Sequence, residues 1–216
     1  MMMLWLTRQC VLSPDVTLDI GGSYHRFVRH HLGIGSSGGT EGSLKRYAAQ
    51  ADRLFQSTFS VRRSLRGLDV VSEGMRVTDR VKLPSDAAQL ARTVRGSAQL
   101  SIGEAFHQEC KRHGFPIDLR VVSGLRSNRA VDLYLLLAYR LPQLSKPITL
   151  TWDDVKAHVG SMAKLDTGPR RGAFKSEIQA CLRDVQLLYS AAHVTCLDEG
   201  LMLLPSAPSV ARARFC

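Results

Sequence analysis

The same order of local sequence signals occurs in both halves of the chain. In the first half, apolar residues recur at helical spacing over 4–12, alternate as in a strand over 15–20, and return to helical spacing over 24–32. Ser13-Pro14 ends the first helix, because the residue before a proline is pushed out of the helical region. Ser23 is a suitable N-cap for the second helix. This half therefore begins with a helix, a short strand and a helix.

A third helix and a strand hairpin complete the first half. The helix is predicted to begin at Thr40 or Ser43 and to run to about Gln56, with its apolar residues on one face. Glycines then separate strand-like stretches, as they do in hairpins. The hairpin is predicted at 58–65 and 67–83, with turns at Gly67 and Gly74.

The second half repeats this order. Thr151 and Asp154 form a capping-box pattern that predicts the start of the middle helix, which ends at Gly160. Asp198-Glu199-Gly200 is a turn sequence between two short strands. The predicted elements are a helix at 129–141, a strand at 147–150, the middle helix, a basic loop at 161–171, a helix at 172–190 and a hairpin at 193–204.

A winged helix has the element order helix, short strand, helix, basic loop, helix and hairpin. The predicted fold class is therefore α+β, with tandem winged-helix domains that are helix-rich and carry short β-hairpin wings. A strand at 97–102 and two short helices at 103–113 and 116–126 begin the second domain; in the alternative, they bridge both domains as one body. The predicted bounds are 1–83 for the first domain, 84–96 for a linker and 97–210 for the second domain.

The net charge of the chain favours a polyanionic partner. Twenty-nine Lys and Arg residues against 19 Asp and Glu residues give a formal charge of +10, which attracts nucleic acid or an acidic membrane surface. The sequence holds no apolar run of the roughly 18–20 residues that a membrane span needs. Its five cysteines are scattered and odd in number, so we expect a reducing, cytoplasmic setting.

The third helix of the second domain offers residues that could read DNA. In a winged helix, this helix enters the major groove and its outward side chains meet base edges. Lys175, Gln179 and Arg183 lie four residues apart and share a stripe, whereas Arg170 and Arg171 suit phosphates at the helix N-terminus. The alternative is a solvated helix face with ordinary charges. The candidates in this domain are Lys164, Arg170, Arg171, Lys175, Ser176, Gln179 and Arg183.

The first domain carries a second group of basic residues. Arginines on hairpin strands are suited to phosphate contacts, which position a protein without reading sequence. Charge on an edge strand also prevents pairing between neighbouring sheets, and both interpretations remain open. The candidates are Lys45, Arg46 and Arg53 on the third helix and Arg62, Arg63 and Arg66 on the hairpin.

Signs of catalysis or metal binding are weak. The chain has no phosphate-binding Gly-x-x-x-x-Gly-Lys-Ser/Thr loop and no Gly-x-Ser-x-Gly nucleophile elbow. His107, Cys110 and His113 would spread over about 120° of a helix, which is too wide for one metal ion without further ligands. We therefore expect no enzyme activity, no cofactor and no metal, and we interpret Trp152 as a packing residue.

Several stretches resemble the plasmid-encoded RepA replication initiators. The stretch 115–120, Phe-Pro-Ile-Asp-Leu-Arg, precedes Leu125-Arg126-Ser127 and the helix from Ala130-Val131-Asp132-Leu133-Tyr134 to Tyr139-Arg140-Leu141. Together they are similar to a signature of that family. Two departures are a start almost on the first helix and a plain Asp86-Ala87-Ala88-Gln89 in place of a tryptophan-rich strand, so a shortened first domain remains open.

The resemblance implies a protein that binds double-stranded origin DNA, recruits host replication proteins including the replicative helicase, and self-associates. In this interpretation the second domain reads a specific sequence, and the first domain contacts the DNA backbone or serves dimerisation. Two alternatives remain: a winged-helix transcriptional repressor that recruits nothing, and an assembly scaffold of the same fold that does not bind DNA.

Overall fold

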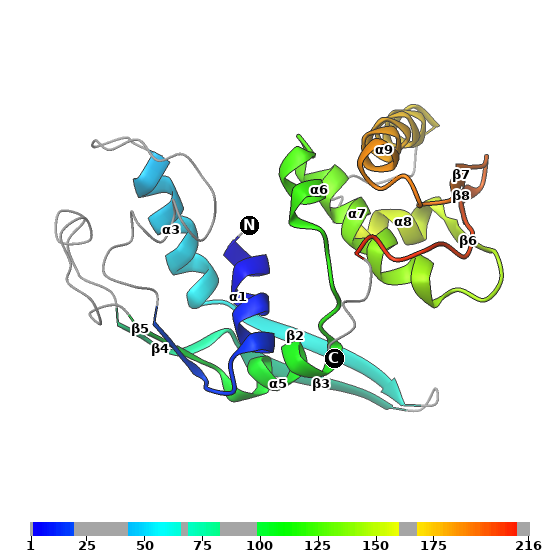
Figure 1. Ribbon diagram of the computed structural model, residues 1–216. Helices are drawn as coiled ribbons and strands as arrows, with labels where there is room; N and C mark the ends of the chain where they lie inside the picture. Colours follow the sequence, from blue (N-terminus) through cyan, green and yellow to red (C-terminus); the bar gives the residue numbers. More distant parts are fainter. Residues whose placement is uncertain (1, 20–42, 66–68, 83–98, 160–167, 211–216) are drawn as a thin grey trace, which may run out of the picture. The chain divides into compact units, whose positions relative to one another are not determined.

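The computed structural model divides the chain into two compact units, Met1–Gly114 and Phe115–Cys216. It describes residues 2–19, 43–65, 69–82, 99–159 and 168–210. Helices and small antiparallel sheets alternate along the chain (Figure 1), so the α+β fold class is confirmed. The predicted helix at 24–32 and the predicted linker at 84–96 lie outside the described residues.

In the first unit, helices pack against antiparallel strands. Strands β1, β5 and β4 form one sheet in that order, and β2 pairs with β3 in a separate hairpin. Leu6, Phe55 and Leu100 are fully buried in the core. The described elements are α1 (Met2–Leu12), β1 (Thr17–Asp19), α3 (Ser43–Phe55), β2 (Thr58–Leu65), β3 (Asp69–Arg76), β4 (Thr78–Lys82), β5 (Gln99–Ile102) and α5 (Glu104–His113).

The predicted hairpin differs from the structure in its second strand. Gly74 forms no turn: it lies inside β3, opposite Ser60. The chain instead changes sheets after Arg76, where Val77 is fully buried and Thr78 donates a 2.7 Å hydrogen bond to the Phe55 carbonyl. Burial of these two side chains turns β4 away from β2, so β4 pairs with β5. The predicted turn at Gly67 lies outside the described residues.

The boundary between the two units lies after Gly114, beyond the predicted domain start at residue 97. Strand β5 satisfies its backbone groups against β1 and β4, and buried backbone groups require such partners. Helix α5 packs on α1, and the buried His107 ring lies 3.2 Å from the Ser13 carbonyl. Residues 99–113 therefore complete the first core, a long-range pairing that local sequence signals do not reveal.

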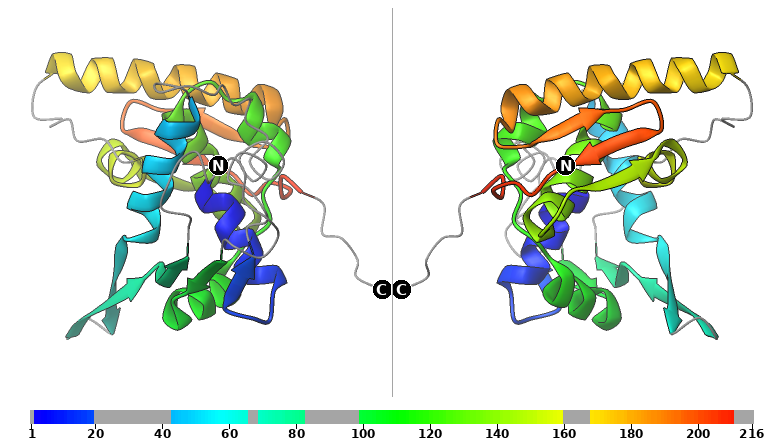
Figure 2. Two further views of the ribbon diagram at one scale, coloured as in Figure 1. Left: turned by 90° about the vertical axis from the view of Figure 1, so that its left-hand side faces the viewer. Right: turned by 90° about the vertical axis from the view of Figure 1, so that its right-hand side faces the viewer.

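The second unit has one three-stranded sheet and a set of helices packed against it. The antiparallel sheet has the order β6-β8-β7, and both views of Figure 2 show the long helix α9 beside the hairpin β7–β8. Tyr134, Trp152 and Ile178 are fully buried in its core. The elements are α6 (Leu119–Gly124), α7 (Asn128–Arg140), the 3-10 turn η1 (Leu141–Gln143), β6 (Ile148–Thr151), α8 (Trp152–His158), α9 (Gly168–Leu188), β7 (Val194–Cys196) and β8 (Gly200–Leu203).

The predicted capping box at the start of α8 is confirmed. The Thr151 hydroxyl accepts a hydrogen bond from the Asp154 backbone N–H, and the Asp154 carboxylate accepts bonds of 2.7 Å and 3.0 Å from the Thr151 hydroxyl and backbone N–H. These bonds hold the pKa of the Asp154 carboxyl below its ordinary value. The box therefore fixes the corner at which β6 becomes α8.

Replacing Asp154 with asparagine should weaken the pH dependence of stability in acid. Because the folded pKa of Asp154 is lowered, its contribution is present above the unfolded pKa, near 4, and is lost as pH falls through the folded value. Acid unfolding followed by circular dichroism should show a shallower decline below about pH 4 in D154N. D132N is the opposite control, because burial raises the pKa of Asp132, so its ionised form opposes folding and its removal should stabilise the protein at pH 7.

Among the described residues, no helix combines the length and the apolar character that a membrane crossing would require.

Candidate nucleic-acid interface

Helix α9 begins four residues earlier than predicted. The expected start was residue 172, but the helix starts at Gly168 and Pro169 occupies its first turn. Proline is well suited to this place, because the first helical residues have no intrahelical partner for their N–H groups. The extension makes Arg170 and Arg171 part of the helix itself, and both residues are exposed.

Two adjacent arginines at this end of α9 create a site of positive potential. The amino end of a helix carries partial positive charge from its dipole, and acidic residues normally complement it. Here the first turn reads Gly168-Pro169-Arg170-Arg171. Backbone N–H groups at such an end bind anions, and arginine matches the geometry of a phosphate. This end of α9 is therefore suited to a phosphate of a DNA backbone.

The faces of α9 separate core residues from exposed polar ones. The buried side is formed by Phe174, Ile178, Cys181, Leu182 and Val185. Ser176, Gln179 and Arg183 are exposed. Arg183 also lies near the half-buried Cys196 of β7, where its positive charge partly offsets the rise that burial causes in the pKa of that thiol. The exposed residues thus occupy a face of α9 that continues toward the hairpin.

Lys175 differs from the other two members of the predicted stripe. It is half-buried, its ammonium donates a 2.5 Å hydrogen bond to the Asp198 carbonyl, and it lies 5.4 Å from the centre of the Trp152 ring. Helical spacing correctly put Lys175 in line with Gln179 but could not reveal this neighbour. The lysine therefore contacts the turn between β7 and β8.

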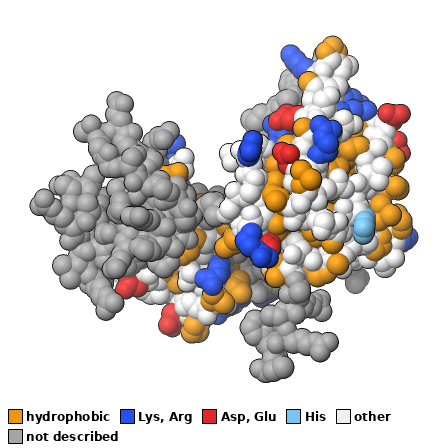
Figure 3. Space-filling view, turned by 45° about the horizontal axis from the view of Figure 1, so that its top comes forward, with side chains coloured by type: hydrophobic (Ala, Val, Ile, Leu, Met, Phe, Trp, Pro, Cys, Tyr) orange, Lys and Arg blue, Asp and Glu red, His pale blue; other side chains and the backbone are white. Residues whose placement is uncertain are grey.

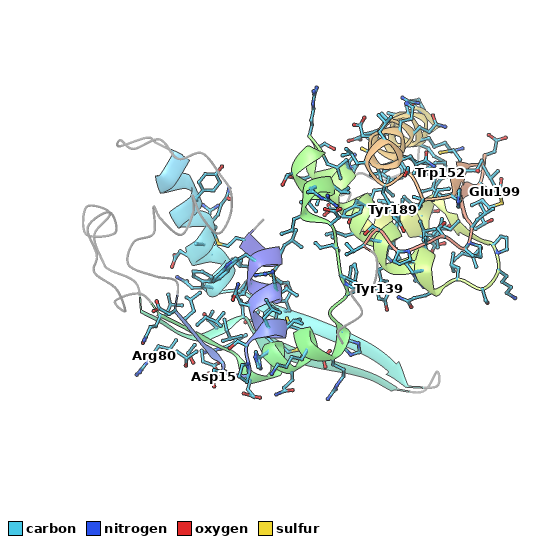
Figure 4. All side chains as sticks on the ribbon, viewed as in Figure 1. Asp15, Arg80, Tyr139, Trp152, Tyr189 and Glu199 are labelled. Atoms are coloured by element: carbon cyan, nitrogen blue, oxygen red, sulfur yellow. The ribbon has the colours of Figure 1, made fainter. Side chains whose placement is uncertain are left out.

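Trp152 is a packing residue, as predicted. It is fully buried, and its ring meets that of Phe174 edge-on at 6.3 Å between centroids. Its backbone N–H donates to the Glu199 carbonyl at 3.2 Å. Figure 4 shows Trp152 and Glu199 close together, where α8 meets the turn of the hairpin.

An ion pair that no local sequence pattern predicts lies beside the exposed face. Glu177 of α9 forms an ion pair with Arg129 of α7. The Glu177 carboxylate thus lies next to Ser176, and the guanidinium of the neighbouring helix compensates its negative charge. On the face that it draws, Figure 3 shows Lys and Arg side chains interspersed with acidic and hydrophobic ones among the described residues. Binding to DNA would therefore depend on particular cations and their positions. The separation of 48 residues between the two partners explains why no local pattern revealed the pair.

The structure describes only part of the basic group in the first unit. Arg53 lies exposed in the last turn of α3. The rings of Phe59 and Phe106 stack at 5.9 Å and attach the β2–β3 hairpin to α5. Lys45 and Arg46 lie on α3, and Arg62 and Arg63 lie on β2 opposite Ser72 and Val71, but only their backbone is described. Arg66 and Lys164 lie outside the described residues.

The histidines and the cysteine that suggested a metal site contact different neighbours. His107 contacts the Ser13 carbonyl, the Cys110 thiol hydrogen-bonds to that of Cys10, and His113 lies 3.6 Å from Glu109. Within the described residues, no group of three or more His, Cys, Asp or Glu side chains is arranged to hold a metal ion.

A comparison with protein families gives a match over most of the chain. The family model described as plasmid encoded RepA protein matches residues 10–154 of the 216. This segment ends inside α8, so α9 and the hairpin β7–β8 lie beyond it. A search of the curated proteins finds no match. Any role of α9 in DNA binding must therefore be argued from its own geometry.

Proposed function

This chain belongs to the family of plasmid-encoded RepA proteins, and we propose that it initiates plasmid replication by binding duplex DNA at the origin. It acts by binding rather than by catalysing a reaction. The observation that carries the proposal is the amino end of α9, where Arg170 and Arg171 stand in the first turn ahead of the exposed Ser176, Gln179 and Arg183.

The topology of the second unit supports a winged-helix mode of binding. Helix α7, strand β6, helices α8 and α9 and the hairpin β7–β8 follow one another, and the sheet has the order β6-β8-β7. The major groove of B-DNA is wide enough to admit a helix. With α9 in the groove, its exposed side chains meet base edges and the hairpin lies along the backbone.

The roles of the exposed residues follow from their chemistry. Gln179 can form a bidentate pair with adenine, and Arg183 can do so with guanine. The Ser176 hydroxyl can donate a hydrogen bond to a base edge or accept one from it. Arg170 and Arg171 bind phosphates and fix the register of α9 on the duplex. Lys164, in the segment ahead of α9, is a further candidate for a phosphate contact.

The first unit is proposed to contribute sequence-independent contacts or dimerisation. Arginines on a hairpin strand can contact phosphates along the DNA backbone. The candidates are Lys45, Arg46, Arg53, Arg62, Arg63 and Arg66. The family also supports the proposal that the bound protein self-associates and recruits host replication proteins, including the replicative helicase.

A replication test separates an initiator from a repressor, because both would use the same DNA surface. The gene is placed with its flanking DNA on a plasmid that has no other origin, and transformants are counted in a suitable host. We expect stable plasmid maintenance that is abolished by a stop codon early in the gene. A protein that binds the flanking DNA tightly but never supports maintenance would instead act as a repressor.

Replacing Gln179 with alanine should change which DNA sites are preferred. A bidentate contact contributes about 1–3 kcal/mol of discrimination, so we expect the preference for the best site over variants at one base pair to fall about tenfold. Competition binding at a fixed salt concentration measures this ratio. If Q179A weakens binding equally on every sequence, Gln179 does not read a base. Ala180, its exposed neighbour, offers a matched control in A180S.

A further inference from the structure

The turn between β7 and β8 is held by hydrogen bonds from two other elements. Within the turn, the Leu197 N–H donates to the Gly200 carbonyl at 2.8 Å. The Asp198 carbonyl accepts two further bonds, one of 2.8 Å from the Trp152 indole N–H and one of 2.5 Å from the Lys175 ammonium. One backbone oxygen of the turn is therefore bound by side chains of both α8 and α9.

Lys175 is fixed in this position by its surroundings. Its ammonium lies 5.4 Å from the centre of the Trp152 ring, a separation at which a cation is attracted to the face of an indole. Trp152 is itself immobilised, because it is fully buried and packs edge-on against Phe174 of α9. Lys175 thus joins the turn to the same helix that exposes Gln179, one helical turn further on.

We infer that Lys175 is a positioning residue, which holds the β7–β8 turn at a fixed place beside α9 so that both elements engage one DNA site together. This inference rests on the proposed function. It assigns Lys175 a role other than the base contact predicted from helical spacing. Loss of the ammonium should leave the turn free to move. Because a mobile turn can adjust to DNA of any sequence, the preference for the correct site should fall.

The first arm of the test requires no DNA. The full-length K175M variant keeps the apolar stem of Lys175 and removes its charge and donors. Hydrogen exchange measured by NMR at the Leu197 amide and at the Trp152 indole N–H should become about tenfold faster in K175M, the effect of losing one charge-assisted hydrogen bond. R171M, on the first turn of the same helix, should leave both rates unchanged. Unchanged rates in K175M would overturn the inference.

The second arm measures affinity for an origin duplex and for a shuffled duplex over a range of salt concentrations. A positioning role predicts that K175M lowers the ratio of the two affinities about tenfold and leaves the salt dependence unchanged. R171M removes a proposed phosphate contact and should make the negative slope of log K against log salt shallower by about 0.9. A slope made shallower to the same extent in K175M, with the affinity ratio preserved, would identify Lys175 as a phosphate contact and overturn the inference.

A double-mutant cycle with W152F tests whether both donors act through the same carbonyl. Phenylalanine keeps an aromatic ring but lacks the indole N–H. Because Trp152 and Lys175 bind one oxygen, their effects on the affinity ratio should be non-additive, and additive effects would contradict a shared role. If the wild-type protein shows no preference for origin DNA, the proposed function fails, whereas the exchange rates still decide whether Lys175 holds the turn.

Discussion

Replacing Arg170 and Arg171 together with alanine is expected to weaken binding to every duplex by about 100-fold at low salt. Both residues are exposed in the first turn of α9, where the helix dipole and the backbone N–H groups already attract an anion. Each phosphate contact releases counterions, so losing two should make the negative slope of log K against log salt shallower by about 1.8. Fluorescence anisotropy with a labelled duplex at several salt concentrations measures both quantities.

The matched control keeps the two positive charges and changes the shape of the side chains that carry them. In R170K/R171K, two lysines retain the electrostatic attraction but lack the planar fork that binds a phosphate through two hydrogen bonds. We expect the salt slope to stay at the wild-type value and the affinity to fall by less than in the alanine variant. An alanine variant whose salt slope equals that of the wild type would exclude both arginines as phosphate contacts.

Replacing Gly200 with valine should strongly destabilise the second unit. A Cβ atom at Gly200 would lie 1.8 Å from the Leu150 carbonyl oxygen and 2.8 Å from the Leu150 carbonyl carbon. These are backbone atoms of β6, the strand with which β8 pairs, so neither can move without breaking the sheet. We expect a loss of about 3 kcal/mol or more in the free energy of unfolding, measured by urea denaturation.

Gly172 provides the contrasting substitution. A Cβ atom at this position of α9 would meet no heavy atom within 4 Å among the described residues outside its own stretch of helix, and alanine favours a helix over glycine by about 0.5–1 kcal/mol. G172A should therefore be neutral or slightly stabilising. A G200V protein with wild-type stability would show that β6 and β8 do not pair closely at this point.

Local signals predicted the second unit well. The Thr151–Asp154 capping box depends on residues three apart, and the hairpin turn at 198–200 depends on adjacent residues. Both partners of such a contact lie within one short stretch of sequence, so a local pattern is enough to predict it. The start of α9 was misplaced because Gly168-Pro169 has the composition of a loop, although proline is equally suited to a first helical turn.

Long-range contacts account for most of what the sequence could not reveal. Local signals predict strand β5 in the second domain, because its partners β1 and β4 lie far from it in sequence. Gly74 was expected in a turn, but it continues a strand whose direction is decided by burial of Val77. Helical periodicity placed Lys175 beside Gln179 without indicating that the Asp198 carbonyl would occupy its ammonium.

The most direct test of the central claim is selective binding of origin DNA by the full-length protein. Fragments of the DNA that flanks the gene compete with shuffled fragments of equal length and composition, at physiological salt, and the bound fraction is sequenced. Specific recognition predicts enrichment of one fragment class, with an affinity at least about 10³-fold above that for shuffled DNA. Equal recovery of flanking and shuffled fragments would contradict a role in reading the plasmid origin.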